Sequence, residues 1–258
     1  MQKSLVLLAI LMLLTGCASS EAAESEALPT STPDATATRT PWPTETPGPT
    51  PTPQTRPPDA PPLSEVSENS DGSLSYSRFD YGYQITFPSN WVIYELSESE
   101  SREFLSMAAE EIPEFEDLFD FSALYSQGVH LIAYDFDPDH YVNEFTTNLN
   151  AISIDMGIAP PTLDSVLDLS KQQFLDFFSD MQIYDSYVAQ NAVGTDYAFL
   201  SYSFSQAYQG SILTVYGNQV MFFVGTDIVT LTISADLSLR EIMDNQAALI
   251  FDTVSVLP

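Results

Sequence analysis

The chain has 258 residues, of which 7 are Lys or Arg and 36 are Asp or Glu, so its formal net charge is −29. This charge excludes a nucleic-acid-binding protein, because contacts with phosphate need many Lys and Arg side chains. It also disfavours docking of the protein surface onto anionic lipid headgroups. One cysteine and two histidines exclude a disulfide framework and a histidine-rich metal site.

Residues 1–17 have the features of a secretory signal. Lys3 precedes an apolar run over residues 5–14, which is too short to span a bilayer as a permanent helix. The run ends in a tetrapeptide that resembles the lipobox of bacterial lipoproteins, Leu14-Thr15-Gly16-Cys17. The resemblance implies that Cys17 carries a lipid and becomes the first residue of the mature protein; an ordinary signal peptide is the alternative. We therefore expect a lipid-anchored protein on the extracytoplasmic side of a cell membrane.

Residues 18–72 have the composition of a tether. Of the 18 prolines in the chain, 12 lie between residues 29 and 62, and threonines separate many of them. Proline fixes the backbone angle φ and removes hydrogen-bond donors, so we expect a disordered segment with polyproline II character. Its threonines are candidate sites for O-linked sugar. A proline-rich ligand for a recognition domain is the alternative interpretation.

Residues 73–258 are expected to form one folded domain. Two strands should flank a turn at Tyr81-Gly82, and a third strand should begin at Trp91. A helix is expected from about Ser97 to Pro113, because a Ser-x-x-Glu capping box precedes apolar residues at helical spacing. The first half ends with two further expected strands, at residues 129–136 and 145–154.

The second half is expected to be a helix followed by an antiparallel meander. The helix covers about residues 163–181, and five strands follow it at residues 182–190, 197–204, 212–216, 220–224 and 228–233. Glycines at positions 210, 217 and 225 mark the expected bends. A capping box formed by Ser238 and Glu241 should open a last helix that ends near Ile250. Strand groups interrupted by three helices predict an α+β domain, with an antiparallel β-sheet sandwiched by helices.

One stretch of this domain resembles a known family. Residues 81–91 read Tyr-Gly-Tyr, an alternating strand and Pro-x-x-Trp, which is similar to the opening of PsbP-like domains. This family includes an extrinsic photosystem II protein and bacterial extracytoplasmic lipoproteins. The resemblance implies an antiparallel sheet between helices and carries no catalytic residue. Plant members are thought to dock through basic residues, whereas residues 73–258 hold 4 basic and 27 acidic side chains. We therefore expect any charged partner to be cationic.

The strongest polar pattern consists of three carboxylates at alternate positions, Asp135, Asp137 and Asp139. They resemble the first half of a calcium loop, which has oxygen ligands at positions 1, 3 and 5. His140 stands where an EF-hand requires glycine, and Thr146 stands where it requires glutamate, so a full EF-hand is excluded. One hypothesis is a looser site for calcium or another divalent metal that also uses Asn143 or Glu144. The other is a strand that runs out into a polar loop.

Two groups of residues bear on catalysis. The acidic cluster Glu110, Glu111, Glu114, Glu116, Asp117 and Asp120 forms either a glycosidase carboxylate pair or a solvated helix face. His130 lies in an apolar strand and is either a general base or a histidine on a sheet face. No Gly-x-Ser-x-Gly motif supplies a nucleophile.

Tyrosines are concentrated in the strand-rich half, where they could line a ligand groove or lie on a half-buried sheet: Tyr184, Tyr187, Tyr197, Tyr202, Tyr208 and Tyr216. The sequence does not separate these two interpretations. The leading hypothesis for the chain is a non-catalytic lipoprotein that binds a ligand or an extracytoplasmic protein partner. A calcium-responsive binding domain is the first alternative, and a hydrolase is the second. No cofactor other than calcium is expected.

Overall fold

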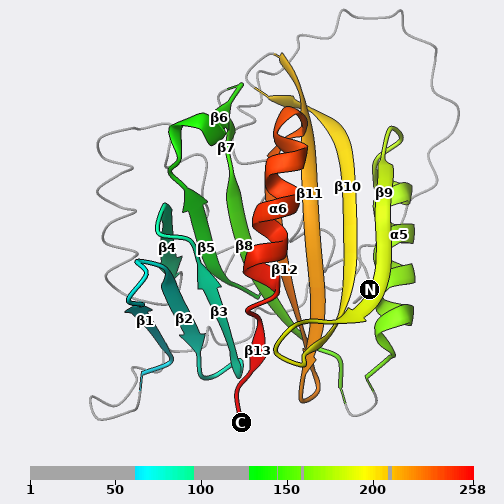
Figure 1. The fold of residues 1–258 in the computed structure, drawn as a ribbon. Helices are drawn as coiled ribbons and strands as arrows, with labels where there is room; N and C mark the ends of the chain where they lie inside the picture. The colour runs from blue at the N-terminus through cyan, green and yellow to red at the C-terminus, as the bar shows by residue number, and fades with distance from the viewer. Residues whose placement is uncertain (1–61, 96–127, 144, 158–159, 209–210) are drawn as a thin grey trace, which may run out of the picture. The chain divides into compact units, whose positions relative to one another are not determined.

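The computed structural model describes residues 62–95, 128–143, 145–157, 160–208 and 211–258. Within these ranges the chain forms two main antiparallel sheets and two α-helices (Figure 1). The signal, the tether up to residue 61, the expected helix at residues 97–113 and the acidic cluster at residues 110–120 lie outside the described residues. Among the described helices, neither is long and apolar enough to cross a membrane.

The larger sheet has seven strands, and all of its neighbouring strands are antiparallel. Their order across the sheet is β4 (Trp91–Glu95), β5 (Val129–Asp135), β8 (Asn148–Asp155), β12 (Asp227–Asp236), β11 (Ser211–Val224), β10 (Asp196–Tyr208) and β9 (Gln182–Gln190). In this sheet β4 and β9 are therefore the two edges. The expected strands at residues 182–190, 197–204 and 228–233 are confirmed, whereas the two expected at 212–216 and 220–224 form the single strand β11.

The smaller sheet has four strands in the order β1 (Ser64–Glu68), β2 (Leu74–Arg78), β3 (Tyr83–Phe87) and β13 (Ser255–Val256). A short ladder joins β6 (Tyr141–Val142) to β7 (Phe145–Thr146). The turn at Tyr81-Gly82 is present, and Gly82 has the positive φ of 64° that favours glycine. The helical elements are η1 (Pro138–His140), α5 (Leu163–Phe177), η2 (Leu237–Leu239) and α6 (Arg240–Phe251).

Two hydrophobic cores lie on opposite faces of the larger sheet. On one face α5 packs against β9, β10 and β11, with Phe174 in contact with Tyr202. On the other face α6 and the smaller sheet share a core that contains Trp91, Phe222 and Met243. A sheet with helices on both faces confirms the predicted α+β fold.

The folded part begins earlier than the expected boundary at residue 73. Strand β1 pairs along its whole length with β2, from Ser64 opposite Arg78 to Glu68 opposite Leu74. Its sequence, Ser-Glu-Val-Ser-Glu, has Val66 as its only apolar residue, and Val66 is 49% exposed. The sequence of β1 therefore lacks the hydrophobic alternation that predicts a strand. Backbone pairing with β2 at the edge of the sheet holds β1 in place.

Gly217 does not form the expected bend. Strand β11 runs straight through it, and Gly217 pairs with Tyr202 on one side and with Ser234 on the other. A Cβ atom at this position would lie 2.6 Å from the Tyr202 ring. The glycine is explained by the close approach of this ring and not by a turn.

The beginning of the last helix also differs from the prediction. The Asp236 side chain accepts a hydrogen bond from the amide of Ser238, so that η2 precedes α6. Leu239, which caps α6, makes no side-chain capping bond. The predicted capping box of Ser238 and Glu241 is therefore wrong. Asp236 is the capping residue, and it caps η2.

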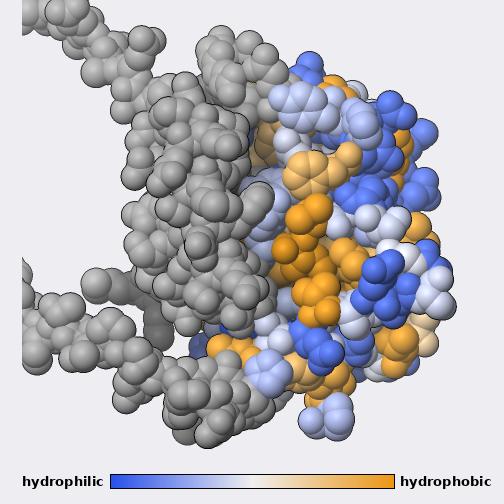
Figure 2. Space-filling model, turned by 90° about the vertical axis from the view of Figure 1, so that its left-hand side faces the viewer, coloured by the Kyte–Doolittle hydropathy of each residue, from blue (hydrophilic) through white to orange (hydrophobic). Residues whose placement is uncertain are grey.

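Figure 2 views the side on which β1 and β4 lie in Figure 1 and shows hydrophobic residues beside hydrophilic ones. The large hydrophobic side chains exposed on these strands or just after β5 are Val66, Val92 and Phe136.

Candidate ligand-binding groove

A groove with a volume of about 320 Å³ lies between α6 and the strands at one edge of the larger sheet. It exists because α6 packs over β11 and β12, so that β10 and β9 extend beyond the helix (Figure 1). Its lining comes from three strands, from α6 and from the residue that follows α6: Asp185, Tyr187, Tyr197, Phe199, Ser201, Tyr216, Arg240, Asp244, Ala248, Phe251 and Asp252. The volume lies at the lower end of the range for small-ligand sites.

The aromatic side chains of the groove pack on one another. The Tyr187 ring stacks on Phe199 with their centroids 5.0 Å apart, and its edge meets Tyr197 at 6.3 Å. Phe199 in turn contacts Phe251 at the end of α6, with their centroids 6.5 Å apart. Tyr187 is 39% exposed, so its ring is open to a ligand.

A polar network fixes the end of the groove next to the start of α6. The Tyr216 hydroxyl donates a short hydrogen bond to Oδ1 of Asp244, and the Asn218 side chain donates to the same oxygen at 3.2 Å. Burial raises the pKa of Tyr216, and the bond to Asp244 adds to this shift. Tyr216 therefore remains a hydrogen-bond donor at neutral pH.

Arg240 completes this end of the groove. Its guanidinium carbon lies 3.9 Å from the Tyr184 ring centroid and 5.7 Å from that of Tyr216. Its Nε lies 3.8 Å from Oδ2 of Asp244. An arginine of the chain is therefore held between an aromatic face and a carboxylate.

A β-bulge in β9 brings the groove residues to one face of the sheet. Ser201 pairs with Asp185, but its neighbour Tyr202 pairs with Ile183, so that Tyr184 is the extra residue. Tyr184 packs on the core beneath α6, and Asp185 lines the groove on the same side. In a regular strand these two neighbours would point to opposite faces.

The structure divides the six predicted tyrosines between the two interpretations. Tyr187, Tyr197 and Tyr216 line the groove, and Tyr184 lies beside it under Arg240. Tyr202 is fully buried in the core on the α5 side. The Tyr208 side chain lies outside the described residues. Sequence reasoning missed five other lining residues of the groove: Asp185, Phe199, Arg240, Asp244 and Asp252. Only Asp252 has a sequence signal, because it directly follows the end of a helix.

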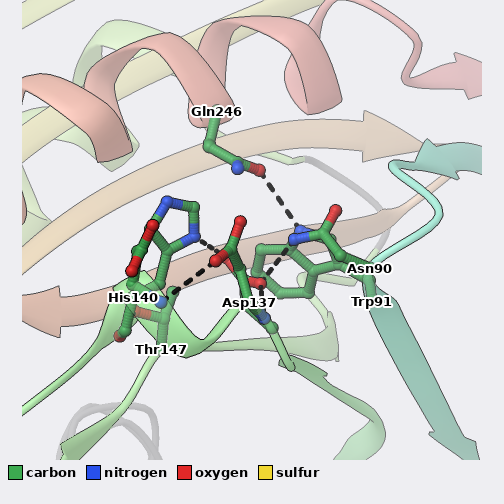
Figure 3. Close-up of polar contacts among 8 residues, drawn as sticks. Asn90, Trp91, Asp137, His140, Thr147 and Gln246 are labelled. Carbon is green, nitrogen blue, oxygen red and sulfur yellow. Dashed lines mark hydrogen bonds and ion pairs between the residues drawn. The ribbon is translucent and has the colours of Figure 1, made fainter.

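The Asp135 loop, at the end of β5, is a second polar cluster (Figure 3). Asp135 is 3% exposed; its Oδ1 accepts hydrogen bonds from the Asn90 side chain at 2.5 Å and from the Asp137 amide at 2.9 Å. Its Oδ2 lies 2.6 Å from Nδ1 of His140. Asp137 caps η1 by accepting from the Asp139 amide at 3.0 Å.

These contacts give two of the predicted metal ligands other roles, since Asp135 and Asp137 accept hydrogen bonds from the chain itself. In the described ranges, no three His, Cys, Asp or Glu side chains are grouped so that they could hold a metal ion. Glu144 lies outside these ranges. The calcium site at Asp135, Asp137 and Asp139 stays a prediction, and the loop geometry accounts for the carboxylates without it.

His130 of β5 is completely buried and contacts Tyr83 of β3. Its Nδ1 lies 3.1 Å from the Gly128 carbonyl oxygen and its Nε2 lies 2.8 Å from the Tyr83 hydroxyl. The carbonyl can only accept, so Nδ1 carries the proton and Nε2 accepts from Tyr83. Burial lowers the pKa of His130 to about 3, and the charge of Arg78 contributes to this shift. His130 is therefore a neutral core histidine that substrate cannot reach.

No family model matches the chain, and no curated protein matches it either. Solved structures that are similar to it include cyanobacterial PsbP from Synechocystis, with 11% identity over 78% of this chain and 97% of that chain and a TM-score of 0.42. LpqN of Mycobacterium tuberculosis, which is involved in cell envelope biogenesis, has 16% identity over 76% and 91% of the two chains and a TM-score of 0.40. The Ran-binding protein Mog1p of Saccharomyces cerevisiae has 9% identity over 75% and 95%, with a TM-score of 0.41.

Proposed function

We propose that this chain is a non-catalytic binding module that a lipid on Cys17 holds at the extracytoplasmic face of a cell membrane. The groove between α6 and β9 is its binding site. The signal and the Leu14-Thr15-Gly16-Cys17 motif support the anchor, and the folded domain supplies the binding surface. The partner is an extracytoplasmic protein or ligand that approaches the domain from solution.

The observation that carries the proposal is the convergence of aromatic side chains from separate elements on one open groove. Tyr187, Phe199 and Tyr216 come from three strands, and Phe251 comes from the end of α6. Tyrosine is enriched where proteins bind partners, because its ring supplies apolar contact and its hydroxyl supplies a hydrogen bond. The groove has strands on one side and α6 on the other, whereas tyrosines that only cover a half-buried sheet need no facing helix.

The environment of the two histidines supports a non-catalytic role. The His130 ring is fully buried and bound on both nitrogens, and His140 is joined to the buried Asp135. Neither ring hydrogen-bonds a serine, threonine or cysteine side chain among the residues that the structure describes. The pairing of nucleophile and base that defines covalent hydrolases therefore has no counterpart in this part of the chain.

Site-specific photocrosslinking in native membranes tests the groove. A benzophenone amino acid in place of Tyr187 should form an adduct, and the same probe in place of Leu175 on α5 should not. Leu175 is a suitable control because it is 51% exposed and lies on the other side of the sheet. The Tyr187 adduct should be lost when Tyr197→Ala is added. Equal capture at both positions, or no capture at Tyr187, contradicts the proposal.

Mass spectrometry of the mature N-terminus tests the anchor separately. We expect a diacylglycerol thioether on Cys17, and release of the Cys17→Ser chain from the membrane fraction. An unmodified Cys17 overturns the anchor and leaves the groove to be judged by the crosslinking result.

A further inference from the structure

The groove has two ends, and one of them is already occupied by a cation of the chain. Arg240 lies over Tyr184 at 3.9 Å and beside the carboxylate of Asp244. An aromatic face together with a carboxylate is a favourable environment for a guanidinium or ammonium group. This end therefore shows that aromatic and carboxylate side chains of the kind that line the groove bind a cation.

The other end presents the same kinds of groups, and no basic side chain of the described ranges is paired with them. The Tyr187 ring lies between Phe199 and Tyr197, and Asp185 and Asp252 line the groove beside it. Both carboxylates are close enough to Tyr187 to raise its pKa further, although burial and Tyr197 contribute more. Neither Asp185 nor Asp252 forms an ion pair with any residue that the structure describes.

Asp252 stands where a carboxylate is unfavourable for stability. It follows Phe251, the last residue of α6, and its amide donates to the carbonyls of Ala248 and Ile250. The carboxyl end of a helix carries a partial negative charge, so an aspartate here is repelled, and a cation is attracted. The last turn of α6 contains no basic residue that would offset this charge.

The other basic side chains of the described ranges are engaged elsewhere. Arg78 is buried and paired with Asp80 at 2.6 Å, and Lys171 on α5 is paired with Asp168 at 2.8 Å. Arg240 is held at the first end of the groove. Within these ranges, no cation of the chain is left to neutralise Asp185 and Asp252.

We infer that the open end of the groove, formed by Tyr187, Asp185 and Asp252, binds the ammonium or guanidinium group of a lysine or arginine of a partner protein. This inference rests on the proposed binding function and names the chemistry of its partner. The groove's volume of about 320 Å³ admits one long side chain and not a folded segment. Its charged lining residues, three aspartates and one arginine, complement a cation.

Titration of the full mature chain with short peptides tests the inference. Ring-labelled tyrosine NMR would report tetralysine binding, with tetraglutamate, tetraglycine and a neutral tetrasaccharide as alternative probes. Tetralysine should shift the Tyr187 signals. Asp185→Asn and Asp252→Asn should each weaken its binding about threefold, and the double variant about tenfold. Tyr187→Leu should weaken it about threefold, whereas Tyr187→Phe, which keeps the ring, should change it less than twofold.

Asp164→Asn is the matched control, because it removes the same charge from α5 on the other side of the sheet. If Asp164→Asn weakens tetralysine binding as much as Asp252→Asn does, the net charge binds the peptide and the inference is overturned. It is also overturned if the tetrasaccharide binds and tetralysine does not. A partner that crosslinks at Tyr187 while tetralysine fails to bind rejects the cation and leaves the proposed function standing.

Discussion

The Asp135 loop and the groove beside α6 are both rich in aspartate, but the two regions use this residue differently. In the loop, Asp135 is buried, and both of its oxygens accept hydrogen bonds from Asn90, His140 and a backbone amide. In the groove, Asp185 and Asp252 line an open surface beside Tyr187 and form no ion pair within the described residues.

The difference shows why an acidic motif in a sequence does not by itself identify a site. The alternating carboxylates of the loop gave the stronger pattern, yet Asp135 and Asp137 serve the loop's own geometry. Asp185 and Asp252 of the groove are 67 residues apart in the chain and form no motif. A carboxylate whose acceptors are saturated by the chain stabilises the fold, whereas Asp185, which accepts a bond from the Ser186 amide at 2.9 Å, has acceptor capacity left for a ligand.

The largest effect is expected from Asp135→Ala. The change leaves the buried His140 ring and the half-buried donors of Asn90 and the Asp137 amide without an acceptor, so the free energy of unfolding should fall by about 3 kcal/mol. Urea unfolding followed by circular dichroism measures it. The matched change in the groove, Asp185→Ala, should cost less than about 0.5 kcal/mol. Equal losses would remove the distinction between the two regions.

The next largest effect concerns His130, whose contacts are also saturated. Its pKa in the folded chain is about 3, below the ordinary value of 6.5, so the unfolded chain binds a proton that the folded chain rejects. Its contribution to stability is therefore complete above pH 6.5 and declines as the pH falls toward 3. Between pH 7 and pH 5 the loss should be about 2 kcal/mol.

The variant His130→Gln isolates this contribution from that of other titrating groups. The free energy of unfolding should depend less steeply on pH between 7 and 5 in His130→Gln than in the unmodified chain. Parallel pH profiles for the two proteins would show that His130 is accessible to protons in the folded state.

A smaller effect of opposite sign is expected in the groove. Asp252→Asn removes a negative charge beside the carboxyl end of α6 and should raise the free energy of unfolding by about 0.5 kcal/mol. Asp164→Asn removes a charge from the first turn of α5, where it is favourable, and should lower it by a similar amount. Chemical denaturation at low ionic strength measures both, and a loss of stability in Asp252→Asn would argue that this residue is structural.

The smallest effect is expected from calcium. A site held at 100 times its dissociation constant would add about 2.7 kcal/mol of stability. Because Asp135 and Asp137 already accept hydrogen bonds from the chain, we expect no measurable shift of the melting temperature. A shift that disappears in Asp137→Asn would restore the calcium hypothesis and place the loop among the binding sites.

Sequence patterns predicted the fold better than the site. The apolar alternation in residues 83–87 and the spacing of Val166, Leu167 and Phe174 reflect burial, which repeats regularly along strands and helices. Strand β1 and the role of Gly217 were missed because backbone pairing and a ring contact leave no periodic signal. Three of the six tyrosines line the groove, and the sequence could not select them.

The bulge in β9 is one reason, because it decides which face Tyr184 shares with Tyr187 and no sequence signal marks its position. Strict alternation would place Tyr184 and Tyr187 on opposite faces of the sheet, whereas the extra residue gives them a common face. A pattern of period two is reliable only while the register of a strand is unbroken.

The bulge also makes the composition of the groove sensitive to chain length. Deletion of Ile183 would restore regular pairing, because Tyr184 would take its place opposite Tyr202 and exchange the α6 face for the α5 face. Tyr184 would then no longer lie beneath Arg240, although Asp185 and Tyr187 would keep their places. In this domain a deletion of one residue, without any substitution, is enough to remove the ring on which Arg240 lies at one end of the groove.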